Sequence, residues 1–505
     1  MKYFDWLKLD TAAIMFASIQ GKNTSRVFRG SFVLKDENVD GDILKQAVYD
    51  VIKRFPYFRV RYNPGFFWSH LQYTDIMPVV AEETEYPAHV QWFGKNGGPE
   101  LRVLYYKRRI SVETAHMLTD GAGSSALMNA ILSRYFVLKG DIDESETNAL
   151  SPESVPCEEE WENAYRKFYT GRKIAENKSE GETHKLPMEP IDDYLKVIFG
   201  IMPFEDIERV AKKYSSSVTE VLAAAEMLAM IKRSDEPIND VIRISVPINL
   251  RQFFPTESLR NFAGDTVLEF RPEGRNDITF DEIIASLAGV LNKKITKEYA
   301  QDFIDKTYGK NINPITRWVP YFVKHKVVNS SQKKDHRNSM SVILTNLGKT
   351  ELSPKIAEKV ERCDSIPGNV TLYGLPITTS PITHNGYTNI SFSINNRDTS
   401  FPKEFFKILC SLGVRIRVES TDDNGYDKSK KDENGKRCPH CDVDLGEEYT
   451  VCPLCGEKAV SENKKIQGFK TAEYPKVFTL PDLSGKKAKV KYSSLKEHLK
   501  AYFDY

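Results

Sequence analysis

A histidine at position 116 precedes an aspartate by four residues and a glycine by five, in the stretch ETAHMLTDGAGSS. A neutral imidazole can accept a proton from a hydroxyl or an amine near pH 7, which is the work of a general base. His116 is therefore a candidate catalytic base, and the alternative is a hydrogen-bonded histidine of the core. For Asp120, the structural alternative is a cap on the N-terminus of a following helix.

Four cysteines near the end of the chain form a second group. They make two Cys-x-x-Cys pairs that ten residues separate: Cys438, Cys441, Cys452 and Cys455. Each pair can bend into a tight turn that presents two thiolates to one tetrahedral ion. His440 lies between the two cysteines of the first pair and is expected to be exposed rather than to bind the metal. Zinc is the expected metal, iron in a rubredoxin-like site is one alternative, and disulfides or free thiols are another. Because four thiolates leave no open position, the metal should be structural.

The elements around the histidine follow from hydrophobic periodicity. ISVETAH alternates like a strand and pairs with LRVLYYK as a hairpin, so that Ile110, Val112, Thr114 and His116 share one face. AGSSALMNAILSRYF then predicts a helix. Residues 26–63 predict strand, helix and strand, and PFEDIERVAKKYSSSVTEVLAAAEMLAMIKRS predicts two helices that Ser215 to Ser217 separate. Later strands are DVIRISVPINL, TVLEF, MSVILTNLG and NISFSINN, with EFFKILCSLG as a closing helix.

Length and composition limit the class of protein. At 505 residues the chain should divide into two or three units. With a net charge of +1, the chain has no strong positive electrostatic potential that would attract a polyphosphate, so no nucleic-acid partner is expected. No apolar run is long enough to span a membrane, and the acidic start does not resemble a signal peptide, so the expected location is cytoplasmic.

Strands and helices occur in both halves, which predicts an α/β fold with two lobes. The predicted units are an N-terminal lobe over 1–188, a C-terminal lobe over 189–420, a linker over 421–436, a zinc ribbon over 437–460 and a Lys-rich tail over 461–505. Within the first unit, the acidic stretch over 142–190 is predicted to be a surface excursion with one helix. The ribbon has little apolar content, so we expect removal of its ion to unfold the ribbon alone.

His-x-x-x-Asp-Gly between a strand and a helix resembles the signature of the coenzyme-A-dependent acyltransferase superfamily, which includes chloramphenicol acetyltransferase, alcohol acetyltransferases and condensation domains. DILKQAVYDVIKRFPYFRVRY, SSVTEVLAAAEMLAM, SVPINLRQFF and VILTNLG are similar to other parts of that family, in the same order. The resemblance covers roughly residues 1–420. It implies two similar lobes with a channel between them, as in chloramphenicol acetyltransferase, and alcohol acetyltransferases are the nearest members.

The resemblance also implies roles for single residues. His116 would remove the proton of the acceptor as it attacks an acyl thioester, and acyl-CoA would be the co-substrate. Asp120 would point away from the channel to an arginine, for which Arg251 is the candidate, and Gly121 would let the backbone turn beneath the histidine. A developing oxyanion needs a donor, for which Thr345 and Asn346 are candidates. Condensation domains carry two adjacent histidines, and Ala115 in the first position weakens amide synthesis more than acyl transfer.

The predicted function is transfer of an acyl group, acetyl in the first instance, from coenzyme A or an acyl carrier protein to a small alcohol or amine. The alternative is a catalytically silent, condensation-like scaffold whose zinc ribbon binds a protein partner. A third interpretation is that the ribbon and the tail bind nucleic acid, because ten lysines lie between residues 463 and 500. Interspersed acids and the absence of arginine in that stretch favour a solvated surface instead.

Overall fold

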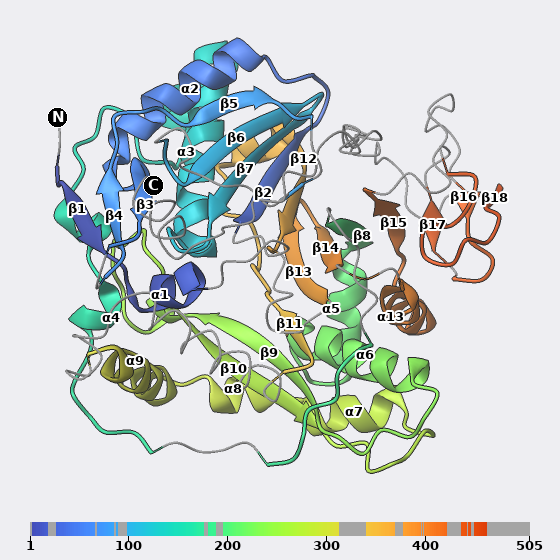
Figure 1. Cartoon of the computed structure of the whole chain (residues 1–505). Coiled ribbons are helices and arrows are strands. Elements are labelled where there is room, and N and C mark those ends of the chain that lie inside the picture. Colours follow the sequence, from blue (N-terminus) through green and yellow to red (C-terminus); the bar gives the residue numbers. More distant parts are fainter. Residues whose placement is uncertain are drawn as a thin grey trace, which may run out of the picture.

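The strands of the computed structural model form three sheets, of three, five and ten strands, and the largest two belong to two lobes (Figure 1). The structure describes residues 3–18, 27–65, 68–84, 87–88, 98–175, 180–187, 195–312, 340–368, 377–394, 396, 398–421, 436–441, 443–445 and 449–461. The tail beyond Ser461 and most of the predicted linker lie outside these residues.

The sheet of the first lobe has five strands in the order β12-β2-β7-β6-β5. Their bounds are Val360–Ile366 (β12), Val27–Leu34 (β2), Arg109–Ala115 (β7), Leu101–Tyr106 (β6) and Val79–Glu82 (β5). Helices α2 (Gly41–Arg54) and α3 (Gly121–Lys139) pack on one another beside this sheet (Figure 1). The predicted strand, helix and strand over 26–63 are confirmed as β2, α2 and β3, and the predicted hairpin is confirmed as β6 and β7. The apolar residues of α2 are buried at the expected helical spacing.

A small sheet lies beside the first lobe, in the order β1 (Trp6–Lys8), β4 (His70–Tyr73) and β3 (Val60–Asn63). The chain passes between β1 and β2 through α1 (Thr11–Ser18), which contacts α9 (Lys297–Asn311) of the second half. These contacts place α1 between the two lobes (Figure 1).

Within its described residues, the predicted surface excursion contains one α-helix, α4 (Ala164–Lys167), and the 3-10 helices η2 (Glu144–Glu146) and η3 (Glu158–Trp161). Part of it is buried, which differs from the expectation. Glu160 lies in the interior because Arg54 donates to both of its carboxylate oxygens, at 2.7 and 2.8 Å. A charge can be buried when a bidentate partner of opposite sign accompanies it.

The sheet of the second lobe has ten strands in the order β10-β9-β11-β13-β14-β8-β15-β17-β16-β18. Their bounds are Ala263–Phe270 (β10), Ile242–Asn249 (β9), Val342–Leu344 (β11), Ile377–His384 (β13), Tyr387–Ile394 (β14), Lys196–Pro203 (β8), Arg417–Ser420 (β15), Asp444–Leu445 (β17), Lys436–Arg437 (β16) and Val460–Ser461 (β18).

Helices cover one face of this sheet and form the largest core of the protein (Figure 1). They are α5 (Phe204–Lys213), α6 (Val218–Arg233), α7 (Phe280–Leu287) and α13 (Ser400–Ser411), with the short helix α8 (Val290–Lys294) nearby. The short helix α12 (Pro354–Lys359) instead contacts β12 and α3 of the first lobe. The predicted break between α5 and α6 is confirmed. Ser217 caps α6, and Glu220 closes a capping box with it.

Two pairings connect the predicted units. β12 comes from the second half of the sequence but pairs antiparallel with β2, so the C-terminal lobe contributes an edge strand to the N-terminal one. β17, from the predicted ribbon, pairs with β15 and extends the ten-stranded sheet. The ribbon is therefore built onto the second lobe. None of the helices in the described ranges is long and apolar enough to cross a membrane.

Candidate active site

A cavity of about 920 Å³ lies between the two lobes. The first lobe contributes β2, the turn after β7 and the start of α3, and α1 lines it as well. The second lobe contributes the face of its sheet that the helices do not cover. Alternate residues of neighbouring strands reach this space, namely Ser245, Pro247 and Asn249 of β9, Ala263 and Asp265 of β10, and Thr378, Ser380 and Ile382 of β13.

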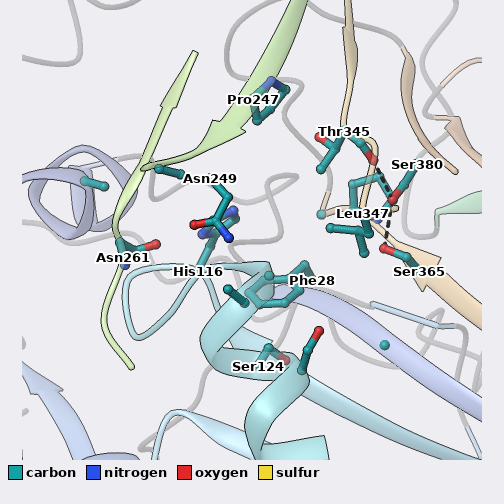
Figure 2. A pocket seen from close by; sticks show the side chains of 18 of the residues that line it. Phe28, His116, Ser124, Pro247, Asn249, Asn261, Thr345, Leu347, Ser365 and Ser380 are labelled. Atoms are coloured by element: carbon teal, nitrogen blue, oxygen red, sulfur yellow. Dashed lines mark hydrogen bonds between the residues drawn. The ribbon is translucent and has the colours of Figure 1, made fainter. Parts of the chain in front are cut away.

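His116 lies at the junction of the two lobes and lines this cavity (Figure 2). β7 ends at Ala115, one residue earlier than predicted, because the Leu118 N–H donates to the Ala115 carbonyl at 2.8 Å and closes a turn. The imidazole stacks on Phe16 of α1, with ring centroids 3.8 Å apart, and Phe28 of β2 approaches at 4.9 Å. The turn and the two aromatic rings hold the histidine at the cavity wall.

Burial lowers the pKa of His116, which keeps the imidazole neutral at pH 7. Its Nδ1 is buried, with the side chain of Asn261 and the backbone of Thr119 close to the ring. A neutral histidine whose ring faces a cavity can take up a proton there. The ring lines the cavity as well as contacting its neighbours in the wall.

Asp120 serves both functions that the sequence allowed. One carboxylate oxygen caps α3 by accepting from the Gly123 N–H at 3.1 Å. The other accepts from Arg251 at 2.8 Å and from the Phe262 N–H at 2.7 Å. The carboxylate therefore connects α3 to the second lobe, and it does not hydrogen-bond to His116.

Gly123, two residues beyond the predicted glycine, is the position that cannot accept a side chain. A Cβ there would lie 2.2 Å from both the Leu259 carbonyl oxygen and the Thr119 hydroxyl. Gly121 begins α3 without a left-handed conformation, and a Cβ on it would meet only the end of the Leu347 side chain, at 3.0 Å. The closer backbone approach is thus made by Gly123 and not by Gly121. The loop packs against the second lobe through Gly123.

The two candidate oxyanion donors lie differently. Thr345 lines the cavity, and β13 fixes its backbone because Thr345 N–H donates to Thr379 and the Ser380 hydroxyl donates to its carbonyl (Figure 2). The Asn346 carboxamide instead donates to Thr219 at 2.9 Å and accepts from the Gly348 N–H. Asn346 does not line the cavity, so its proposed role as a donor is not supported.

Asn249 was missed in the sequence, although it ends β9 directly before the predicted Arg251. Its carboxamide oxygen accepts from the Arg251 N–H at 3.1 Å, and its side chain lines the same cavity as His116. Because the carboxamide oxygen already accepts a hydrogen bond from Arg251, the amide N–H groups can donate to a group in the cavity. Alternation along ISVPIN places Ser245, Pro247 and Asn249 on one face, and this was the available signal.

The four cysteines of the ribbon come together as predicted. Their sulfur atoms all lie within 4.8 Å of one another, and His440 is exposed. Four thiolates at 2.3 Å from a tetrahedral zinc would be about 3.8 Å apart, so the cluster fits one ion. The Cys441 backbone N–H donates to the Cys438 sulfur at 3.3 Å, which favours the thiolate form of Cys438. A thiolate is the form that binds a metal.

No protein-family model matches the sequence, and no curated protein matches it. Solved structures do share its fold. TRI101 of F. graminearum, in complex with coenzyme A and deoxynivalenol, superposes with a TM-score of 0.53 at 10% identity, over 81% of this chain and 99% of that one. Polyketide synthase associated protein 5 of Mycobacterium tuberculosis gives 0.50 at 13% identity, over 80% and 98%.

The epimerization domain from the third module of tyrocidine synthetase B also gives a TM-score of 0.50, at 12% identity, over 81% of this chain and 97% of that domain. An epimerization domain of a peptide synthetase and a protein that binds coenzyme A therefore share this architecture. The predicted two-lobed α/β fold is confirmed. At these identities the likeness is one of fold.

Proposed function

We propose that the chain transfers an acyl group, acetyl in the first instance, from a coenzyme A thioester to a hydroxyl or an amine, with His116 as the general base. The observation that carries this proposal is the position of the His116 imidazole at the wall of the cavity between the lobes, where burial lowers its pKa. The structure of TRI101 with bound coenzyme A supports the choice of donor, because it has the same fold.

In the proposed step, the acceptor oxygen or nitrogen attacks the thioester carbonyl while its proton passes to His116. The tetrahedral intermediate collapses and breaks the carbon–sulfur bond. The leaving thiolate then takes the proton back from the imidazole. No acyl-enzyme forms, so a single general base is sufficient.

The negative charge on the intermediate needs hydrogen-bond donors that are already in position. The Asn249 carboxamide and the Thr345 hydroxyl, which line the same cavity as His116, are the proposed donors. Asp120 and Arg251 are proposed to hold the loop that carries His116, because their ion pair joins that loop to the second lobe.

We further propose that Cys438, Cys441, Cys452 and Cys455 hold one zinc ion. The ion would supply structural cross-linking and no open coordination position, so no step of the transfer involves it. The compact set of four sulfur atoms supports this assignment.

A free-thiol release assay tests the function. Acyl-CoAs of several chain lengths and a phosphopantetheine thioester are offered with a panel of alcohols and amines, and the mass of each product is measured. His116→Ala should lower turnover on the best pair by about a hundredfold or more. His70→Gln is the control, because it removes a histidine from β4, which does not line the cavity.

Two results would contradict the proposal. Wild-type turnover in His116→Ala would exclude the histidine as the base. No thiol release with any pair would instead favour the silent scaffold, whose ribbon would then be tested for a protein partner.

A further inference from the structure

Asp265 lies on the cavity wall of the second lobe. It belongs to β10 and stands opposite Pro247 of β9, and both residues line the cavity. Helix α9 passes over the same region, where Phe303 and Thr307 also line the cavity. The Asp265 carboxylate thus lies in a part of the cavity between the sheet and α9.

Other charged groups at the cavity are either paired or exposed. Arg29 is fully buried and forms ion pairs with Glu83 and Glu113. Asp364 is buried beside Arg362, at 2.7 Å. Exposed side chains account for the remaining charges, namely Lys310, Lys349 and Glu351.

Asp265 differs from all of these. Within the described ranges, no side chain forms an ion pair or a hydrogen bond with its carboxylate, and the Tyr299 hydroxyl donates to its backbone carbonyl instead. Burial raises the pKa of Asp265, and the charge of Lys306 on α9 offsets this only through space. The side chain is only partly buried and faces the cavity, so its carboxylate is accessible to a group that arrives from outside.

The surroundings indicate which group this is. Phe303 of α9 lines the same cavity as Asp265, and its ring packs against Gly264 of β10. A carboxylate on a cavity wall is suited to an ammonium group, which gains a charge-assisted hydrogen bond there.

We propose that Asp265 is a specificity-determining residue that binds a protonated amino group of the acyl acceptor. The acceptor would then be an amino alcohol, with its ammonium group at Asp265 and its hydroxyl group at His116. This inference rests on the proposed acyl transfer, and it selects the hydroxyl as the nucleophile.

The test compares amino alcohols with neutral alcohols of the same length. The pairs are 3-amino-1-propanol with 1-butanol, 6-amino-1-hexanol with 1-heptanol, and 8-amino-1-octanol with 1-nonanol. For the pair of suitable length, the wild type should show a kcat/KM ratio of about ten or more in favour of the amine, the usual effect of a hydrogen bond to a charge. Asp265→Asn should bring this ratio close to one.

A second measurement does not depend on turnover. The amino alcohol alone should raise the melting temperature of the wild type and not that of Asp265→Asn, and the unliganded variant should melt no lower than the wild type. Glu351→Gln is the control, because it removes a cavity carboxylate that is exposed, and it should keep the ratio.

The outcomes separate the two proposals. Acyl transfer with the same ratio in wild type and Asp265→Asn would overturn the role of Asp265 and leave the acyltransferase intact. A lower melting temperature of unliganded Asp265→Asn would show a structural role and would also overturn it. Stabilisation by the amine without transfer to any acceptor would support the binding site and contradict the proposed function.

Discussion

Asp120 and Arg251 connect the two lobes through a contact of 2.8 Å between a carboxylate oxygen and a guanidinium nitrogen, although 131 residues separate them in the chain. Both side chains are largely buried, with 7% and 15% of their surface exposed. Arg251 also donates to the carbonyls of Ser258 and Arg260. The guanidinium therefore organises the segment before β10 as well as the loop after His116.

Neutralising either partner should lower stability and turnover together. Asp120→Asn leaves a guanidinium without its counter-ion, and Arg251→Met leaves a carboxylate without one. Breaking a buried ion pair in this way typically lowers the free energy of unfolding by about 3 to 5 kcal/mol. Arg251→Met should be the more severe because it also frees two carbonyls. Melting temperature and turnover of both single variants and the double variant measure this.

The double variant should lose less than the sum of the single variants, because each single variant already breaks the pair. The exposed pair of Glu208 and Lys212 on α5 is the control, and its members should act independently. Additive losses at Asp120 and Arg251 would show that the contact carries no coupling energy. An unchanged melting temperature in Asp120→Asn would return the aspartate to a catalytic role.

Gly123→Ala should destabilise the protein by about 1 to 3 kcal/mol, the usual cost of overpacking. The added methyl would lie 2.2 Å from a backbone carbonyl and from the Thr119 hydroxyl, so the loop must shift. Turnover should fall too, because the same loop carries His116. Denaturant unfolding measures the loss.

Gly121→Ala is the matched variant for that experiment. Its methyl would meet only the flexible end of Leu347, so its free energy of unfolding should stay close to that of the wild type. Equal losses at the two glycines would contradict the assignment of the close contact to Gly123.

Parts of the fold and the site could be predicted because their signals are local. Helical spacing in α2 and the interruption between α5 and α6 are properties of short segments. The pairing of Asp120 with Arg251 came from the family resemblance. The four cysteines were predictable since their spacing alone suits one metal ion.

Other parts depend on packing that no local pattern encodes. All eight residues of β8 are buried, so this strand lacks the alternation that reveals a strand in a sequence. β12 crosses to the other lobe, and only the folded chain shows its partner. Asn346 follows Thr345, yet the two side chains face different surroundings because successive residues of an extended chain point to opposite sides.

Zinc should be present at one ion per chain and should be lost in Cys441→Ser and Cys452→Ser. Elemental analysis of freshly purified protein measures this, and Cys157→Ser, an exposed cysteine outside the cluster, should keep the metal. Protein without stoichiometric metal would contradict the assignment.

Loss of the ion should lower the stability of the second lobe as well as that of the ribbon, in contrast to the expectation from sequence. Cys438, Cys441 and Cys452 belong to the same core as α6 and α13, and β17 is hydrogen-bonded to β15. Hydrogen exchange in β15 and β8 should therefore increase after chelation. Exchange that increases only within residues 436–461 would show that the ribbon unfolds independently.

Glu226 should make the stability of the second lobe depend on pH. It lies in the middle of α6, fully buried, and burial raises the pKa of its carboxyl to about 8, while the Thr379 hydroxyl donates to one of its oxygens at 2.7 Å. In the unfolded chain the same carboxyl ionises near its ordinary pKa of about 4.5.

The folded state therefore retains a proton that the unfolded state releases between these two values. The contribution of Glu226 to stability is fully present below about pH 4.5 and is lost as the pH rises towards 8, at about 1.4 kcal/mol per pH unit. Glu226→Gln keeps the acceptor for Thr379 and cannot ionise. The variant should resemble the wild type near pH 5 and be increasingly more stable than it up to pH 8. Melting curves across this range, with Glu208→Gln on the exposed face of α5 as the control, measure the difference. A constant difference in stability from pH 5 to pH 8 would show that Glu226 does not titrate in this range.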